Sequence, residues 1–256
     1  MNPKSYAIRR PYLFSTLIIL LIVAVYLLAG TAVYLLQRSG SDFTLYLIAN
    51  VVLTLVFIAI LTGMRCWKRT GFQALPNRRD LWLYALPLLP VLGNLVFGIQ
   101  THELRSVLTF FVLAALIGFV EETAFRGLIL QALAPRGLWK AAIISAVLFG
   151  LVHSMNALSG SDPAYILLQI GYAMAFGFGW ACVTLRTRVI WPLVIIHALI
   201  DFTSFMAVDL TGEPVFDAYV LGISAVFIVV FTIYGIFMLR LTRQPAQILS
   251  ASPAQS

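Results

Sequence analysis

Long apolar runs, separated by short stretches that hold most of the charged residues, repeat along the whole chain. An α-helix needs about 20 apolar residues to cross roughly 30 Å of hydrocarbon, and the runs have this length. They predict eight spans, at about residues 12–36, 44–64, 81–100, 106–134, 138–158, 163–185, 189–208 and 216–239. The expected fold is therefore all-α, a polytopic membrane bundle of about eight transmembrane helices.

The third run differs from the others because it contains Pro87, Pro90, Gly93 and Asn94. Proline removes a backbone donor and clashes with the preceding turn of a helix. A kink is therefore expected in this span.

The spans are expected to form one transmembrane helical domain, residues 1–243, because no long polar segment divides them. Its motif-bearing core lies at about residues 106–208. The remaining residues, 244–256, are mostly small or polar and include two prolines, which predicts a disordered tail.

Composition and charge add a prediction of how the bundle is oriented in the membrane. The chain is 61% hydrophobic and 11% charged, far from the roughly 25% charged residues of a soluble domain, and its net charge is +7. The basic residues gather in alternate loops instead of on one soluble face, which argues against a nucleic-acid partner. With the amino terminus inside, the outer segments hold only Arg38 and Arg105, and the cytoplasmic segments hold Lys4, Arg9, Arg10, Arg65, Lys68, Arg69, Arg78, Arg79, Arg136, Lys140, Arg186, Arg188, Arg240 and Arg243.

This partition follows the positive-inside rule, so both termini are expected in the cytoplasm. The expected location is a bacterial cytoplasmic (inner) membrane, with the lipid bilayer as the surrounding partner. The sequence leaves the oligomeric state open.

Six ionisable residues remain inside the predicted spans: Glu121, Glu122, Arg126, His153, His197 and Asp201. A charge at the centre of a membrane helix costs roughly 2.5 to 3.5 kcal/mol even on the lenient insertion scale. Counted along the helices from the nearest basic loop residue, these groups lie roughly 14 to 22 Å deep, in one layer. They predict a shared buried site, with structural ion pairing as the plainer alternative.

Local spacing suggests roles within this layer. Glu122 and Arg126 are one turn apart, which allows an ion pair, whereas Glu121 points about 100° away. Glu121 is thus left without a local cation and is the candidate general base. His197 and Asp201 are also one turn apart, so that Asp201 can orient the imidazole or share a proton with it.

Other reactive residues lack a recognisable arrangement. Cys66 and Cys182 lie far apart without metal-like spacing, which indicates free thiols. His102 stands beside Glu103 in an outer loop and is expected to be solvated. The chain contains no His-Glu-x-x-His pair, no Gly-x-Ser-x-Gly elbow and no phosphate loop, so the usual signatures of zincins and serine hydrolases are missing.

Three strings of the chain resemble, in order, the three motifs of the CPBP family, which includes CAAX prenyl proteases and bacteriocin-processing or self-immunity proteins. They are Glu121-Glu122-Thr-Ala-Phe-Arg126-Gly127, Phe149-Gly-Leu-Val-His153 and His197-Ala-Leu-Ile-Asp201. The stretch Arg186-Thr-Arg188-Val-Ile-Trp191-Pro192 also resembles the family's approach to its third motif.

The resemblance implies an intramembrane endopeptidase that cleaves a membrane-associated or prenyl-type peptide or protein substrate. Glu121 and His153 would activate a water, and His197 and the residue at position 201 would stabilise the oxyanion. The family often has asparagine there, and an ionised Asp201 could not donate a hydrogen bond. Either Asp201 is protonated or it serves His197.

No cofactor is favoured, because the resemblance to the prenyl-protease branch points to a metal-free glutamate mechanism. Zinc is the alternative, since Glu121, His153 and His197 could supply three ligands and leave a position open for water.

Two other functions also fit the residues. A proton-coupled transporter could use the same groups as a relay, although no internal repeat is visible and the groups form a layer instead of a path. A non-catalytic bacteriocin-immunity or scaffold protein could keep the fold and act by binding a partner.

Overall fold

The described part of the chain is entirely helical. The computed structural model describes residues 7, 9–35, 42–96, 98–100, 103–159, 162–207 and 218–242, and no strand occurs among them. His102 and the tail predicted at 244–256 lie outside the described residues. The longer helices are α2 (Pro11–Leu35), α3 (Asp42–Gly63), α5 (Leu104–Glu122), α7 (Leu138–Val152), α8 (Pro163–Thr187), α9 (Trp191–Ala207) and α10 (Ala218–Leu241).

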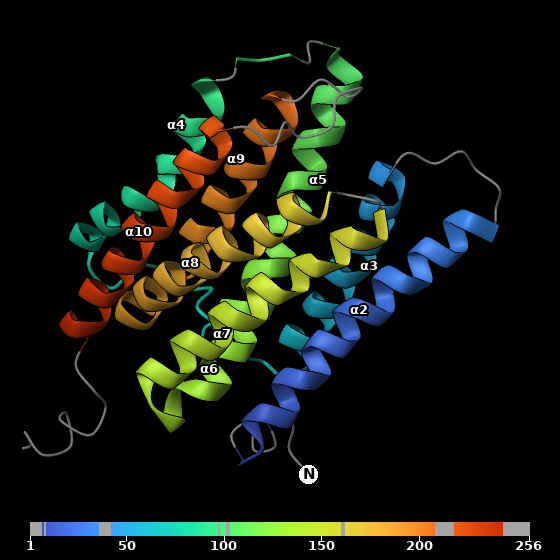
Figure 1. Cartoon of the computed structure of the whole chain (residues 1–256). Coiled ribbons are helices and arrows are strands. Elements are labelled where there is room, and N and C mark those ends of the chain that lie inside the picture. Colours follow the sequence, from blue (N-terminus) through green and yellow to red (C-terminus); the bar gives the residue numbers. More distant parts are fainter. Residues whose placement is uncertain are drawn as a thin grey trace, which may run out of the picture.

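These helices run roughly alongside one another and form a bundle (Figure 1). Within the described residues, six helical stretches are long and apolar enough to cross a membrane: Pro11–Leu35, Thr44–Gly63, Leu104–Arg136, Leu138–Ala157, Pro163–Thr187 and Ala218–Leu241. The helix Trp191–Ala207 is apolar but shorter. The predicted all-α membrane bundle is confirmed, and the orientation of its termini stays a prediction.

The third predicted span is interrupted, not merely kinked. It consists of two 3₁₀ helices, η1 (Arg78–Tyr84) and η2 (Leu86–Leu88), followed by the short helix α4 (Leu89–Val96). Pro87 and Pro90 fall within this stretch, and each removes a backbone donor that a continuous helix needs. The segment is held to α9 instead, because the Asn94 amide donates hydrogen bonds to Ile200 O and Thr203 Oγ1.

The fourth span also departs from a regular α-helix. A π-helix, η3 (Thr123–Ile129), follows α5, and the chain continues through α6 (Leu130–Leu133) and the 3₁₀ turn η4 (Ala134–Arg136). All seven residues of η3 are buried. Ser145 of α7 donates a hydrogen bond of 2.9 Å to Phe125 O, so a backbone carbonyl of the wide turn has a partner on the neighbouring helix. Such π-helical turns frequently occur at functional sites.

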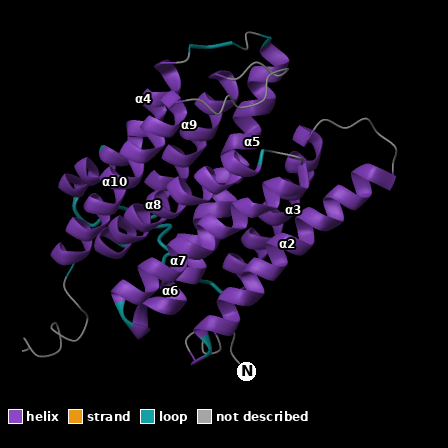
Figure 2. Ribbon diagram, in the orientation of Figure 1, coloured by secondary structure: helices purple, strands orange, loops and turns teal. Residues whose placement is uncertain are grey.

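The helices pack in two groups that meet at η3 and α6. Helix α5 packs against α9 and α3, α8 lies between α7 and α10, and α2 packs against α3 at the edge (Figures 1 and 2). A 3₁₀ turn, η5 (His153–Ser159), leads from α7 toward α8. Helices make up most of the described chain, and loops form the connections between them (Figure 2).

The closest approach of α5 and α9 occurs at Gly118. A Cβ atom added there would lie 2.7 Å from Val194 O and 3.0 Å from Ala198 N, both backbone atoms of α9. Without a water-driven hydrophobic effect between helices, such close backbone contact is the main way to stabilise packing in lipid.

We expect Gly118→Ala to destabilise the folded protein by about 1–3 kcal/mol, because the backbone of α9 must move away. Thermal unfolding of the purified protein in detergent measures the loss as a lower Tm. Gly222→Ala in α10 is the matched control, since a Cβ there meets no atom within 4 Å. Equal Tm values for the two variants would contradict the tight α5–α9 contact.

Candidate active site

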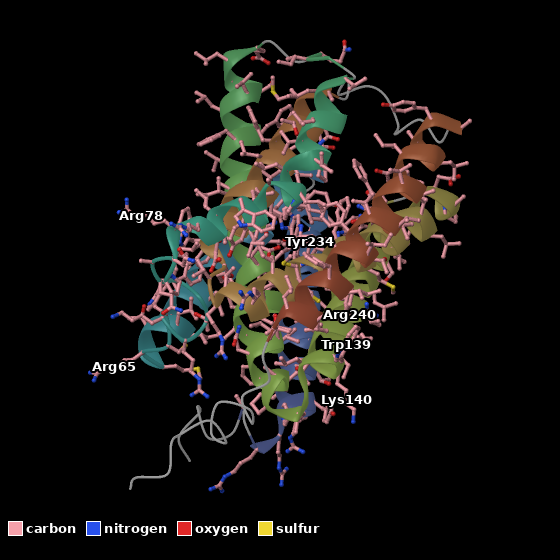
Figure 3. All side chains as sticks on the ribbon, turned by 90° about the vertical axis from the view of Figure 1, so that its left-hand side faces the viewer. Arg65, Arg78, Trp139, Lys140, Tyr234 and Arg240 are labelled. Atoms are coloured by element: carbon pink, nitrogen blue, oxygen red, sulfur yellow. The ribbon has the colours of Figure 1, made fainter. Side chains whose placement is uncertain are left out.

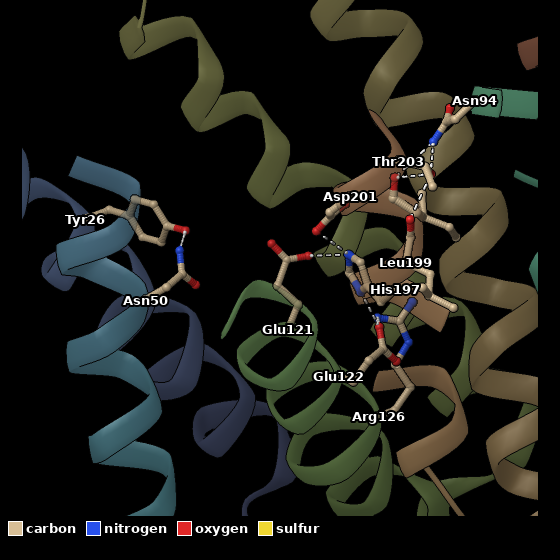
Figure 4. A network of polar contacts seen from close by, with 11 residues as sticks. Tyr26, Asn50, Asn94, Glu121, Glu122, Arg126, His197, Leu199, Asp201 and Thr203 are labelled. Carbon is tan, nitrogen blue, oxygen red and sulfur yellow. Dashed lines mark hydrogen bonds and ion pairs between the residues drawn. The ribbon is translucent and has the colours of Figure 1, made fainter. Parts of the chain in front are cut away.

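The structure brings five of the six predicted ionisable residues together in one cluster (Figure 4), and the sixth, His153, lines the same cavity. Four of them, Glu121, His153, His197 and Asp201, line one cavity with a volume of about 810 Å³. Glu122 and Arg126 lie behind this cavity and are completely buried. The side chains come from α5, η3, η5 and α9, which are far apart in the sequence.

Glu122 connects two of these elements. Its Oε1 atom accepts a hydrogen bond of 3.0 Å from Arg126 Nη1, which is the predicted ion pair, and a second of 2.9 Å from His197 Nδ1. The pair lies entirely out of contact with solvent. Because a buried charge without a partner is very costly, this ion pair fixes the spacing of α5, η3 and α9.

Aromatic rings surround the Arg126 guanidinium. Its carbon Cζ lies 4.1 Å from the centre of the Phe149 ring and 5.2 Å from that of Trp180. The ring faces attract the cation, and this attraction is strongest where water is excluded. The same two rings pack edge-on against the His197 imidazole, at centroid distances of 6.1 Å for Phe149 and 5.3 Å for Trp180.

His197 is thereby held in one orientation. Glu122 is an acceptor, so Nδ1 of His197 carries a proton and donates it. The other ring nitrogen, Nε2, faces the cavity, where it lies 3.7 Å from Glu121 Oε2 and 3.6 Å from Asp201 Oδ2. Two carboxylates that converge on one nitrogen repel each other unless a proton lies among the three groups, so this cluster is built to hold a proton.

His153 has a defined tautomer. Its Nδ1 lies 2.9 Å from Phe149 O, and a carbonyl can only accept, so Nδ1 carries the proton. The helix α7 ends at Val152, which leaves this histidine at the start of η5 with its ring beside the cavity. In its neutral form the Nε2 atom is therefore free to accept a hydrogen bond from a bound water.

The sequence reasoning missed a set of neutral polar residues, four of which line the cavity (Tyr26, Tyr46, Asn156 and Gln169) while Asn50 lies behind it. The Asn50 amide donates hydrogen bonds of 2.9 Å to Tyr26 Oη and to Tyr46 O (Figure 4 shows the first). The Tyr46 hydroxyl donates to Asn156 Oδ1 at 3.3 Å, and the Asn156 amide donates to Gln169 Oε1 at 2.8 Å. The signal in the sequence that could have revealed them was an asparagine, Asn50, inside an apolar run.

The described residues include no group of three or more His, Cys, Asp or Glu side chains placed to hold a metal ion. Cys66 and Cys182 are buried, take part in no disulfide and do not line the cavity. The zinc set of Glu121, His153 and His197 stays a prediction that needs a chemical test.

Comparison with known proteins supports the reading of the motifs. Residues 103–203, which contain all three motif strings, match the family described as type II CAAX prenyl endopeptidase Rce1-like. No curated protein and no solved structure matches the chain. The resemblance seen in the sequence is thus confirmed for this segment. The match supports a peptidase and, together with the apolar helices, indicates an integral multi-pass membrane protein with a membrane-associated substrate.

The buried ion pair generates a prediction about stability. Glu122→Gln and Arg126→Met should each lower stability by roughly 3–5 kcal/mol, because each leaves the other charge buried without a partner. The double variant should lose much less than the sum of the two, since no orphan charge remains. Thermal unfolding of the purified variants measures the coupling, and additive losses would contradict the pairing.

Proposed function

Because residues 103–203 match the type II CAAX prenyl endopeptidase family, we propose that this protein is an intramembrane endopeptidase that hydrolyses a peptide bond with a water activated by Glu121 and His153. The observation that supports this most is the shared cavity of about 810 Å³, onto which Glu121, His153, His197 and Asp201 all open. It is large enough for several residues of a peptide.

Glu121 is the proposed general base. The Arg126 guanidinium contacts Glu122 at 3.0 Å, so the Glu121 carboxylate is not tied up in that ion pair. Its side chain is 19% exposed, whereas Glu122 is fully buried, so only Glu121 can meet a water in the cavity. When the His153 ring is neutral, its Nε2 atom is the second acceptor that can orient this water.

The proposed reaction balances within these residues. Glu121 takes a proton from the water, and the water oxygen forms a bond to the carbonyl carbon of the substrate. The resulting oxyanion accepts hydrogen bonds from Nε2–H of His197, which in this step carries a proton on both ring nitrogens, and from the protonated carboxyl of Asp201. The C–N bond then breaks, and Glu121 returns its proton to the leaving amine.

Glu122 and Arg126 have a different role in this scheme. They do not line the cavity, and Glu122 acts through its 2.9 Å hydrogen bond to His197 Nδ1. That bond directs Nε2 toward the oxyanion position, so Glu122 is a positioning residue. Arg126 keeps Glu122 ionised so that it can accept this bond.

We expect Glu121→Gln to reduce cleavage about 10²- to 10⁴-fold, because the amide has nearly the same shape but cannot take a proton. The measurement compares the protein termini of membranes from cells that express the wild type and the variant. Glu103→Gln is the matched control, since Glu103 is exposed and lies outside the cavity.

Termini that disappear only in Glu121→Gln would identify both the activity and its substrates. If Glu121→Gln folds normally and no terminus changes, a binding or transport function replaces the proposed one. The same preparation treated with a chelator should keep its activity. A loss that added zinc reverses would instead assign the metal-dependent mechanism to Glu121, His153 and His197.

Asp201 allows a sharper test of the oxyanion assignment. Asp201→Asn should retain activity within about tenfold, because the amide can donate the hydrogen bond that the protonated acid donates. Asp201→Ala should lose about 10²- to 10³-fold, the usual cost of one oxyanion donor. Both losses are measured as cleavage rates of the two variants on a substrate that the comparison of protein termini has identified. An inactive Asp201→Asn variant that still folds would contradict the oxyanion role.

A further inference from the structure

The cavity belongs to one end of the bundle. Its wall includes the second half of α2 (Tyr26 to Tyr34), the beginning of α3 (Leu45 and Tyr46) and the turn that follows α7 (His153 to Asn156). Gln169 near the start of α8 and Phe205 near the end of α9 complete it. Since neighbouring helices alternate in direction, these segments all lie at the same face of the bundle (upper right in Figure 1).

Most of the basic residues lie toward the other face. Arg65, Lys140 and Arg240 lie in the lower half of Figure 3, and Arg78, at the start of η1 with Arg79, lies near its mid-height. The first three belong to a larger set at the opposite helix ends, before α2 and α7 and after α3, α8 and α10: Arg9, Arg10, Arg65, Lys68, Arg69, Arg136, Lys140, Arg186, Arg188 and Arg240. At the cavity end, the ionic side chains outside the site that the structure describes are those of Glu103, Arg105 and Asp162. By the positive-inside rule the basic face is cytoplasmic.

The cavity is closed toward this basic face. Its innermost wall includes Ile22, Val120 and Phe125, whose exposed fractions are 5%, 1% and 0%. Among the α2 residues that line the cavity, the exposed fraction rises from 5% at Ile22 to 51% at Leu27 and 81% at Tyr34, toward the opposite face. A second cavity beside Arg69 at the basic face has a volume of only about 50 Å³, and no site residue lines it.

We propose that the substrate reaches Glu121 from the membrane face opposite the basic residues, as an extended segment of an exported or membrane-anchored peptide. This inference rests on the proposed function and names the side of the membrane that supplies its substrate. A lipidated carboxyl terminus presented from the cytoplasm would instead meet the closed wall formed by Ile22, Val120 and Phe125.

The end of the cavity that lies away from the basic face is called the mouth here. Its wall has the chemistry that an extended peptide needs. Main-chain amides and carbonyls that leave water must find hydrogen-bond partners in the protein. Tyr46, Asn156 and Gln169 offer hydroxyl and amide groups along one side of the cavity. Leu113 and Ile117 of α5 provide apolar surface for the peptide's side chains.

Cysteine labelling in spheroplasts tests the direction of the mouth. Thr31→Cys places a thiol on the cavity wall, and Lys140→Cys is the matched position at the basic face. The wild type serves as the blank, since both native cysteines are buried. A membrane-impermeant maleimide should label Thr31→Cys in intact spheroplasts at least about tenfold faster than Lys140→Cys, which should react only after detergent is added.

The opposite pattern, or no labelling of Thr31→Cys in intact spheroplasts, would overturn the proposal. The labelling experiment reports the direction of the mouth and does not require the protein to cleave a substrate. Its outcome is therefore distinct from that of the Glu121→Gln comparison. Where cleavage is measurable, a bulky maleimide on Thr31→Cys should block it and leave Lys140→Cys active after labelling. Full activity of the labelled Thr31→Cys variant would show that the substrate uses another route.

Discussion

The structure of the site depends on one buried carboxylate. Glu122 neutralises Arg126 and accepts the Nδ1 proton of His197, so one oxygen atom joins α5, η3 and α9. In a medium without water, neither the guanidinium nor the carboxylate could stay charged alone. The position of the His197 ring, and therefore of everything that faces its Nε2 atom, follows from this ion pair. The rings of Phe149 and Trp180 complete the enclosure.

The two adjacent glutamates point about 100° apart around the helix and therefore have different roles. Glu122 faces inward and is fully buried, whereas Glu121 faces the cavity and keeps partial exposure. The π-helix η3 begins immediately afterwards, and its wider turn carries Arg126. The ion pair still spans four residues, so the wider turn does not separate the two charges.

Much of this arrangement could be predicted from the sequence because its causes are local. Apolar runs predict spans in lipid, and the one-turn spacing of Glu122 and Arg126 predicts their ion pair. The partner of His197 could not be predicted in this way. Local spacing favoured Asp201, but Glu122 from a different helix makes the 2.9 Å bond, and Asp201 lies 3.6 Å from the other nitrogen. The prolines of the third span predicted a kink, but neither its complete interruption nor the π-helix could be predicted from a periodic pattern in the sequence.

The proposed catalytic groups and part of the wall that faces them come from separate stretches of the chain. Glu121, His153, His197 and Asp201 all lie within residues 103–203, whereas Tyr26, Thr31 and Tyr46 belong to α2 and α3, which that family match does not include. In the proposed enzyme, helices α2 and α3 can therefore accumulate substitutions that alter which peptides are accepted, while the bond-breaking chemistry stays the same. Selectivity and reactivity are thus free to evolve at different speeds in this fold.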